Sequence, residues 1–362
     1  MADASTKTGE LRFRPPEVEA ADEVAWLLRA AFADDSLRPP PSDRIETVLD
    51  LAGRLGLAAA IGARQREWKI SPPLPAPLAE NFKKAHAHAA IRTAVLERSA
   101  RHLASTASRL AVPIVFLKGF ALFLTDRDWS AGRPIADLDL LAPEADAKIL
   151  HAELRRNGYR ALGERGNEHH LAPLVAPEGS NVDLHFCLRG LAFDGPTWAT
   201  WQDLRERDFL EDTADYPGDC AIPESGALTA HLLVHGLSHH IWRPQSYPLL
   251  QLLGDLIHLL PNDAAWQRFE NDWRPILLRS VAAPELDALR RLALSLRAGR
   301  VPDLGASGPE PVAVLLRHIL AGYLDPSYGR RLRLRHALDR LRDAVRQGRL
   351  VHYLARKTGR NR

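Results

Sequence analysis

The 362-residue sequence contains only two cysteines, Cys187 and Cys220, which are too few for a disulfide framework or a zinc site of four thiolates. It has no apolar run near the roughly 18 residues that a membrane-spanning helix needs. The first residues also lack the apolar segment of a secretory signal. These absences exclude an extracellular disulfide scaffold and argue against membrane contact, so we expect a protein of the reducing cytoplasm.

Three catalytic motifs are missing as well. The chain has neither a P-loop nor G-x-G-x-x-G, so a classical ATPase, kinase or dehydrogenase has no support. His231, His235 and His239 recur every four residues along one helix face, but no glutamate completes H-E-x-x-H. Because helical histidines more often satisfy core hydrogen bonds, we expect structural roles for this stripe rather than zinc binding.

The composition that remains is globular, with 46% hydrophobic and 26% charged residues. The length predicts two or three folding units. A net charge of +3 conceals a basic tail, residues 329–362, in which twelve Arg or Lys accompany two acids. Such a tail can bind nucleic acid, but its leucines recur at helical spacing, so we favour a solvated amphipathic helix.

The hydropathy pattern divides the chain into four regions. Residues 1–99 show helical spacing, with long helices predicted over 18–32 and 78–110. Residues 100–195 alternate short apolar strands with helices and predict a small α/β core. Residues 196–328 return to helical spacing, and the tail follows. We therefore predict an α/β (α+β) fold with a small mixed sheet flanked by helical regions.

Two acids stand in the second predicted strand of this core, within ADLDLLA. Residues two apart in a strand point to the same face, so Asp137 and Asp139 project together while Leu138 and Leu140 enter the core. Two carboxylates on one face repel unless a cation lies between them. An oxygen-preferring ion such as Mg²⁺ satisfies that need, with Mn²⁺ as an alternative.

A third acid has the same setting in a later strand. Asp183 lies in NVDLHF, with His185 two residues further on. If this strand pairs beside the strand that carries Asp137 and Asp139, the three carboxylates converge. Three carboxylates can hold two metal ions.

A phosphate site is predicted at the turn between the first strand, VPIVFL, and the helix that follows. Lys118 and Gly119 fall at this turn, where free N–H groups and the helix dipole attract anions. Gly119 permits close approach of the backbone, and Lys118 supplies a charge. Arg133, four residues before Asp137, can hold a further phosphate oxygen or pair with that acid.

Four segments follow one another along this part of the chain: FLKGFALFL, RPIADLDLL, HAELRRNGYR and NVDLHF. Taken in this order, they resemble the uncharacterised nucleotidyltransferase family of the polymerase-beta superfamily. The later HLLVHGLSHH and LLGDLIHLL resemble the helical portion of that family. The resemblance extends over about residues 85–300.

The resemblance implies a divalent metal and transfer of a nucleoside monophosphate from a nucleoside triphosphate, ATP among them, to an unidentified acceptor. Asp137 and Asp139 would ligate metal, and Asp183 would complete the site and help deprotonate the acceptor. Lys118 and Gly119 stand where the superfamily usually has glycine-serine against the triphosphate. The resemblance places His235 and Asp255 in the helical portion, and we expect both, with His185, on the acceptor side.

We therefore predict a metal-dependent nucleotidyltransferase whose acceptor is a small molecule, a peptide or a protein. One alternative is a catalytically silent accessory module of a natural-product or polysaccharide pathway. Another is an RNA-binding protein that uses the basic tail. Dependence of catalysis on Asp183 separates the enzyme from the silent module.

Overall fold

The computed structural model describes residues 18, 20–33, 37–65, 73–130, 132–163, 166–195, 197–240, 249–304, 310–325, 327–328 and 330–331, with only the backbone of 238–240. The predicted tail helix beyond residue 331 and the side chain of His239 lie outside the described residues. No helix within the described ranges has both the length and the apolar character that crossing a membrane requires.

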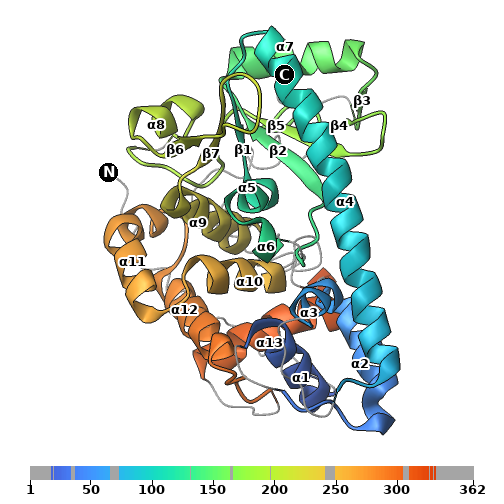
Figure 1. Cartoon of the computed structure of the whole chain (residues 1–362). Coiled ribbons are helices and arrows are strands. Elements are labelled where there is room, and N and C mark those ends of the chain that lie inside the picture. Colours follow the sequence, from blue (N-terminus) through green and yellow to red (C-terminus); the bar gives the residue numbers. More distant parts are fainter. Residues whose placement is uncertain are drawn as a thin grey trace.

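A seven-stranded mixed sheet forms the upper part of the molecule in Figure 1. Its strands run in the order β3-β4-β5-β2-β1-β7-β6. Their bounds are β1 Ile114–Phe116, β2 Asp137–Leu141, β3 Arg160–Ala161, β4 Leu174–Val175, β5 Asn181–His185, β6 Leu210–Asp212 and β7 Cys220–Pro223. β2 pairs with β5 and β1 with β7 in parallel, and the other neighbours are antiparallel.

The central strands form because their apolar residues are buried. Ile114, Val115 and Phe116 of β1 have no exposed surface, and neither do Leu138 and Leu140 of β2. β-branched and aromatic side chains suit such a pleated, buried surface. The central strands therefore form a rigid base for the polar residues that alternate with the leucines of β2.

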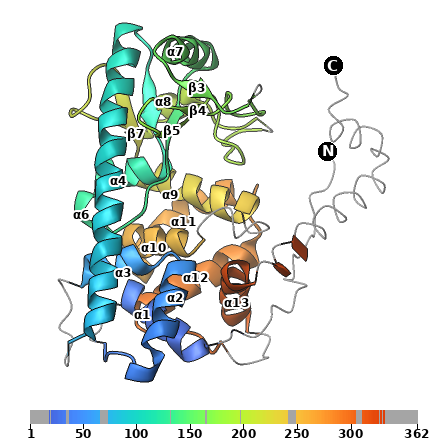
Figure 2. The ribbon, with the colours of Figure 1, turned by 90° about the vertical axis from the view of Figure 1, so that its right-hand side faces the viewer.

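Helices cover this sheet and extend below it. Those nearest the strands are α4 Ala76–Arg109, α5 Lys118–Thr125, α6 Arg127–Ser130, α7 Glu144–Arg156 and α8 Trp201–Glu206. α4 packs on β2 and α7, and α7 packs on β5. The long α4 also continues down to α2 and α3, so that it joins the sheet to the helical part (Figures 1 and 2).

The lower part of the molecule is helical and combines both ends of the described chain (Figure 2). Its helices are α1 Ala21–Phe32, α2 Ile45–Arg54 with a preceding 3₁₀ turn η1 Ser42–Arg44, α3 Ala58–Arg64, α9 Ser225–Val234 with a following π-helix η2 His235–His240, α10 Leu249–Leu259, α11 Asp263–Leu277, α12 Ala283–Arg297 and α13 Pro311–Leu324. α1 packs against α10 and α12. The N-terminal helices and the C-terminal helices therefore share one core.

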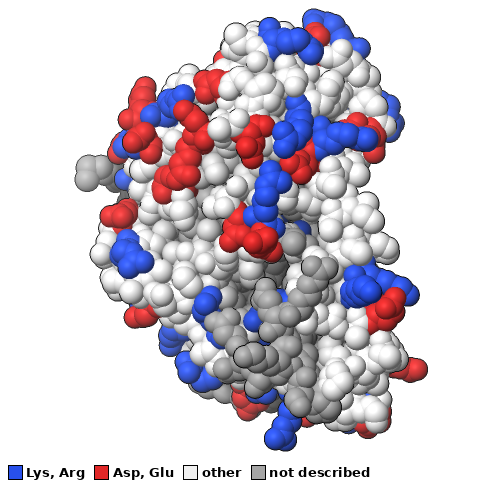
Figure 3. Space-filling model, viewed as in Figure 1, with Lys and Arg blue, Asp and Glu red and all other residues white. Residues whose placement is uncertain are grey.

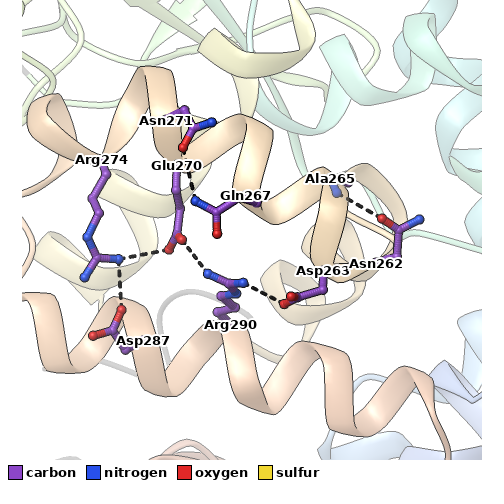
Figure 4. Close-up of polar contacts among 9 residues, drawn as sticks. All are labelled: Asn262, Asp263, Ala265, Gln267, Glu270, Asn271, Arg274, Asp287 and Arg290. Atoms are coloured by element: carbon purple, nitrogen blue, oxygen red, sulfur yellow. Dashed lines mark hydrogen bonds and ion pairs between the residues drawn. The ribbon is translucent and has the colours of Figure 1, made fainter.

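Ion pairs join α11 to α12 (Figure 4). Glu270 is buried and accepts hydrogen bonds from Arg274, at 3.0 Å, and from Arg290. Arg274 also pairs with Asp287, and Arg290 with Asp263. Because each buried charge has a partner, this network fixes the two helices relative to each other without leaving an unpaired carboxylate.

Charges of both signs lie close together over most of the face seen in Figure 3. Among exposed residues of the described chain, Arg205 pairs with Asp212 in this way. Among the described residues, this face therefore carries no extended region of one sign.

The predicted fold class is confirmed. β4 pairs antiparallel with β5 across the Pro-Glu-Gly-Ser turn, as a hairpin. β6 and β7 were not expected, and they continue the sheet into residues 196–328, which the sequence predicted to be helical. β7 is missed because Cys220–Pro223 is a run of only four buried residues that ends in proline, and β6 because two of its three residues are exposed acids.

Candidate functional site

The parallel pairing of β2 with β5 brings the acids together. Asp139 lies directly opposite Asp183, and Asp137 lies opposite Asn181. Residues opposite each other in neighbouring strands project to the same face, as do residues two apart in one strand. Asp137, Asp139, Asp183 and His185 therefore share one face of the sheet, as the convergence predicted from the sequence requires.

Asp139 is the centre of this group. Its side chain is only 3% exposed, and its Oδ1 accepts hydrogen bonds from Lys118 Nζ at 2.6 Å and from His185 Nε2 at 2.8 Å. Burial alone would raise the pKa of Asp139, but Lys118 and His185 hold it well below its usual value. Asp139 is therefore an ionised carboxylate with a fixed orientation.

The two other acids are harder to ionise. The negative charge of Asp139 and, secondly, burial raise the pKa of Asp137 to about 7. Burial and then the charge of Asp139 raise the pKa of Asp183. Three negative charges at close range repel one another, so ionising all three carboxylates is energetically unfavourable. The site therefore favours either a bound cation or protons on Asp137 and Asp183.

His185 holds Asp139 in position. Burial lowers the pKa of His185, which favours the neutral ring, so the hydrogen on Nε2 is assigned from its carboxylate partner. The sequence predicted an acceptor-side role for this histidine, and that role stays a prediction. The sequence did not predict the contact between His185 and Asp139, because the two residues lie on different strands. The spacing of residues along β5 gives no information about partners on β2.

The strand-to-helix turn lies directly beside these acids. The N–H of Leu117 donates to the carbonyl of Asp139 at 2.9 Å, and α5 begins at the next residue, Lys118. Lys118 has a φ of 50°, a left-handed conformation that is strained for a residue with a side chain. Although burial opposes its charge, the neighbouring Asp139 and Asp137 raise the pKa of Lys118, and it is protonated.

A second group of residues supports the turn from below. Arg133 donates from Nε and Nη2 to the two carboxylate oxygens of Asp255 on α10, at 2.7 and 2.8 Å. Both side chains are largely buried, and burial raises the pKa of Asp255 against the opposing charge of Arg133. The predicted phosphate role of Arg133 and acceptor-side role of Asp255 stay predictions, and in this structure the two are paired.

Gly119 makes this pairing compatible with the turn. A Cβ on Gly119 would lie 2.2 Å from Nη1 of Arg133. That guanidinium cannot simply move away, because Asp255 holds it through two hydrogen bonds. Gly119 is therefore required for the close approach of Arg133, and the approach of a phosphate that the sequence predicted at this residue stays a prediction.

Replacing Gly119 with alanine should lower the free energy of unfolding by about 1–3 kcal/mol, because the new methyl group displaces a buried ion pair. Gly53→Ala is the matched control. Gly53 stands in α2, where an added Cβ would have nothing within 4 Å, and alanine there should stabilise the helix by up to about 1 kcal/mol. Urea denaturation of both variants measures the difference. Equal stability of the two would show that the guanidinium has room to move.

His170 was missed by the sequence analysis. It forms an isolated bridge with His185, and the centroids of the two rings are 5.4 Å apart. Nothing in the local sequence pattern shows that residues 169–171 run beside β5, so this histidine could not be placed at the site.

His235 lies in the π-helix η2, where its ring is 6.1 Å from that of His231. Its acceptor-side role stays a prediction. The side chain of His239, the third member of the predicted stripe, is not among those described.

The donor set fits a divalent cation. Asp139, Asp183 and His185 each offer a ligand atom, and these atoms lie within 4.8 Å of one another. Carboxylate oxygens are the ligands that Mg²⁺ prefers, and imidazole suits Mn²⁺ and related metals as well. Asp137 projects from the same face and adds charge to this cluster. The site therefore combines acids whose ligand atoms suit a divalent cation with a cationic residue, Lys118, at the start of a helix.

The sequence matches the family described as uncharacterised nucleotidyltransferase over residues 41–297, and the chain belongs to this family. The matched segment contains every site residue from Lys118 to Asp255, and it begins earlier than the resemblance in the sequence indicated. No curated protein matches the chain. Among solved structures, the chain is similar to that of the antibiotic-resistance factor ANT(2'')-Ia, at 13% identity and a TM-score of 0.36, with 51% of this chain and 93% of that chain covered.

Proposed function

We propose that this protein is a metal-dependent nucleotidyltransferase that moves a nucleoside monophosphate from a nucleoside triphosphate to an acceptor oxygen. One observation carries the proposal: Asp139 and Asp183 lie opposite each other on paired strands, directly beside the turn at Lys118. Membership of the nucleotidyltransferase family supports it. The acceptor is a small molecule, a peptide or a protein.

In this proposal the acids hold the metal. Asp137 and Asp139 bind the divalent cation that accompanies the triphosphate, and Asp183 completes the site. Mg²⁺, with Mn²⁺ as an alternative, fits their oxygen ligands. When bound, the metal stabilises negative charge on the phosphate oxygens as a Lewis acid.

The protein's own groups position the reactants and move the proton. Asp183 takes the proton from the acceptor oxygen as a general base. The acceptor oxygen then bonds to the α-phosphorus, the bond from that phosphorus to the bridging oxygen breaks, and pyrophosphate leaves. Free N–H groups at the start of α5 and the ammonium of Lys118 hold the phosphates that depart.

Isothermal titration calorimetry tests the metal and nucleotide parts of this proposal. Each nucleoside triphosphate is titrated into the protein with Mg²⁺ and again with EDTA. We expect binding of at least one triphosphate that requires Mg²⁺ and that the Asp137→Asn/Asp139→Asn variant loses. The control is Asp43→Asn/Asp50→Asn, which changes two exposed acids in the helical part and should bind as wild type does.

Two results would contradict the proposal. Unchanged, metal-dependent binding by the Asp137→Asn/Asp139→Asn variant would place the nucleotide elsewhere. Failure of the folded wild-type protein to bind any triphosphate would support the catalytically silent module instead. RNA binding through the tail would show itself by affinity that falls steeply with salt and disappears when residues 329–362 are deleted.

A further inference from the structure

An ammonium group already contacts the central acid of the proposed metal site. Lys118 Nζ lies 2.6 Å from Oδ1 of Asp139, the most buried acid of the cluster. The Lys118 side chain is only 14% exposed, and the charges of Asp137 and Asp183 act on it as well. The three-carboxylate cluster thus already contains one positive charge, supplied by the chain itself.

This ammonium and a divalent cation cannot both use the same oxygen at low cost. Asp139 Oδ1 accepts from both Lys118 and His185, so the lone pairs of this oxygen are occupied and a metal would have to bind through the other oxygen, Oδ2. A cation on Asp139 would face the charge of Lys118 in a buried environment, where like charges repel strongly. The ammonium therefore weakens metal binding at Asp139, and the metal binds best once Lys118 has left this carboxylate.

The backbone at this residue indicates where the ammonium can go. Lys118 is the first residue of α5, beside the N–H groups that begin the helix, and it adopts a strained left-handed φ. Strain of this kind persists only where the surroundings impose it, and it is common at switch positions. Rotation of the side chain about its own bonds carries the ammonium from Asp139 toward an anion bound at the turn.

We propose that Lys118 is an internal counter-ion that occupies the metal site in the empty protein and moves onto the triphosphate when metal and nucleotide bind. The proposal rests on the proposed function of the site and adds a regulation to it. Lys118 keeps the acid cluster neutralised without metal, and it makes metal binding unfavourable until a phosphate can receive the ammonium. Free metal alone therefore binds weakly, and the complete substrate binds well.

The test measures binding of metal and of nucleotide separately in Lys118→Met. Electron paramagnetic resonance of free Mn²⁺ gives the metal affinity without nucleotide, and calorimetry with Mg²⁺ gives the triphosphate affinity. We expect Lys118→Met to bind Mn²⁺ about 10-fold more tightly than wild type, a typical size for such coupling. It should bind the triphosphate about 10-fold more weakly, because a charge-assisted contact to phosphate is lost.

Lys148→Met is the matched control, because Lys148 makes only an exposed pair with Glu144 on α7, and it should change neither affinity. Lys118→Gln removes the charge but keeps a hydrogen-bond donor, and it should resemble Lys118→Met if that variant is too unstable to purify. A lysine with a purely structural role would weaken both affinities when replaced, whereas a counter-ion changes them in opposite directions.

Mn²⁺ affinity in Lys118→Met and Lys118→Gln that is equal to or weaker than that of wild type overturns the counter-ion proposal. Such a result leaves the proposed function standing if triphosphate binding still depends on Mg²⁺ and on Asp137 and Asp139. Loss of that dependence contradicts the proposed function itself, so the two failures are distinguishable.

Discussion

Asp183→Asn is expected to lower the rate of pyrophosphate release by about 10²–10⁴-fold, the usual contribution of a general base. Nucleotide affinity should change little, because Asp137 and Asp139 hold the cation that accompanies the triphosphate in the proposed mechanism. The carboxamide has nearly the shape of the carboxylate but cannot accept the proton of the acceptor oxygen. The expected result is therefore a loss in turnover without a matching loss in binding.

Pyrophosphate release can be followed with water as the acceptor, so the experiment does not require the natural acceptor. Hydrolysis of the triphosphate then yields the monophosphate and pyrophosphate. Asp212→Asn is the control, because Asp212 is an acid on strand β6 of the same sheet but is 74% exposed. An unchanged rate in Asp183→Asn would remove this residue from the mechanism, and an equal loss of rate and binding would place it on the nucleotide instead.

The arrangement of the acids was largely predictable from the sequence. The alternation of Asp137 and Asp139 with Leu138 and Leu140 indicates a strand with one polar face, and the leucines are fully buried. The acid in NVDLHF repeats this pattern. What local pattern cannot provide is the register, since a slip of one residue would point Asp183 to the other face. The pairing of Asp139 with Asp183 is a property of the whole sheet.

The partners of the charged residues were not predictable. Arg133 and Asp255 are 122 positions apart, and Lys118 and Asp139 are 21 apart. Residue type shows that such groups need partners when buried, but sequence spacing does not identify those partners. The same reason explains why His185 was placed on the acceptor side, and why residues 169–171 were not placed beside the site at all.

The helical part shows a related limit. Helical spacing predicted the two long helices over 18–32 and 78–110, close to the observed bounds of α1 and α4. It also predicted helical structure in residues 196–328, which contain α10, α12 and α13. α3 was missed because its seven residues are mostly small. The local sequence does not predict that α1 packs against α10 and α12. An apolar helix face shows that the helix is buried on that side but does not specify its neighbour.

The ion pair between Arg133 and Asp255 should have the largest effect on stability. Asp255→Asn is expected to lower the free energy of unfolding by about 3–5 kcal/mol, because it leaves a buried guanidinium without its counter-charge. The Asp255 side chain is 1% exposed and that of Arg133 is 10% exposed, so water cannot replace the lost partner. Urea denaturation with EDTA present measures this loss without a contribution from bound metal.

Two comparisons separate the pair from its parts. Asp212→Asn breaks an exposed pair with Arg205 and should cost less than about 1 kcal/mol. The Arg133→Met/Asp255→Leu variant removes both charges together and should recover much of the loss, because apolar side chains of similar volume often replace a buried ion pair without penalty. A loss below about 1 kcal/mol in Asp255→Asn would contradict the prediction. If the double variant recovers stability but binds the triphosphate poorly, nucleotide binding requires Arg133 itself, as a phosphate contact or as the group packed against Gly119.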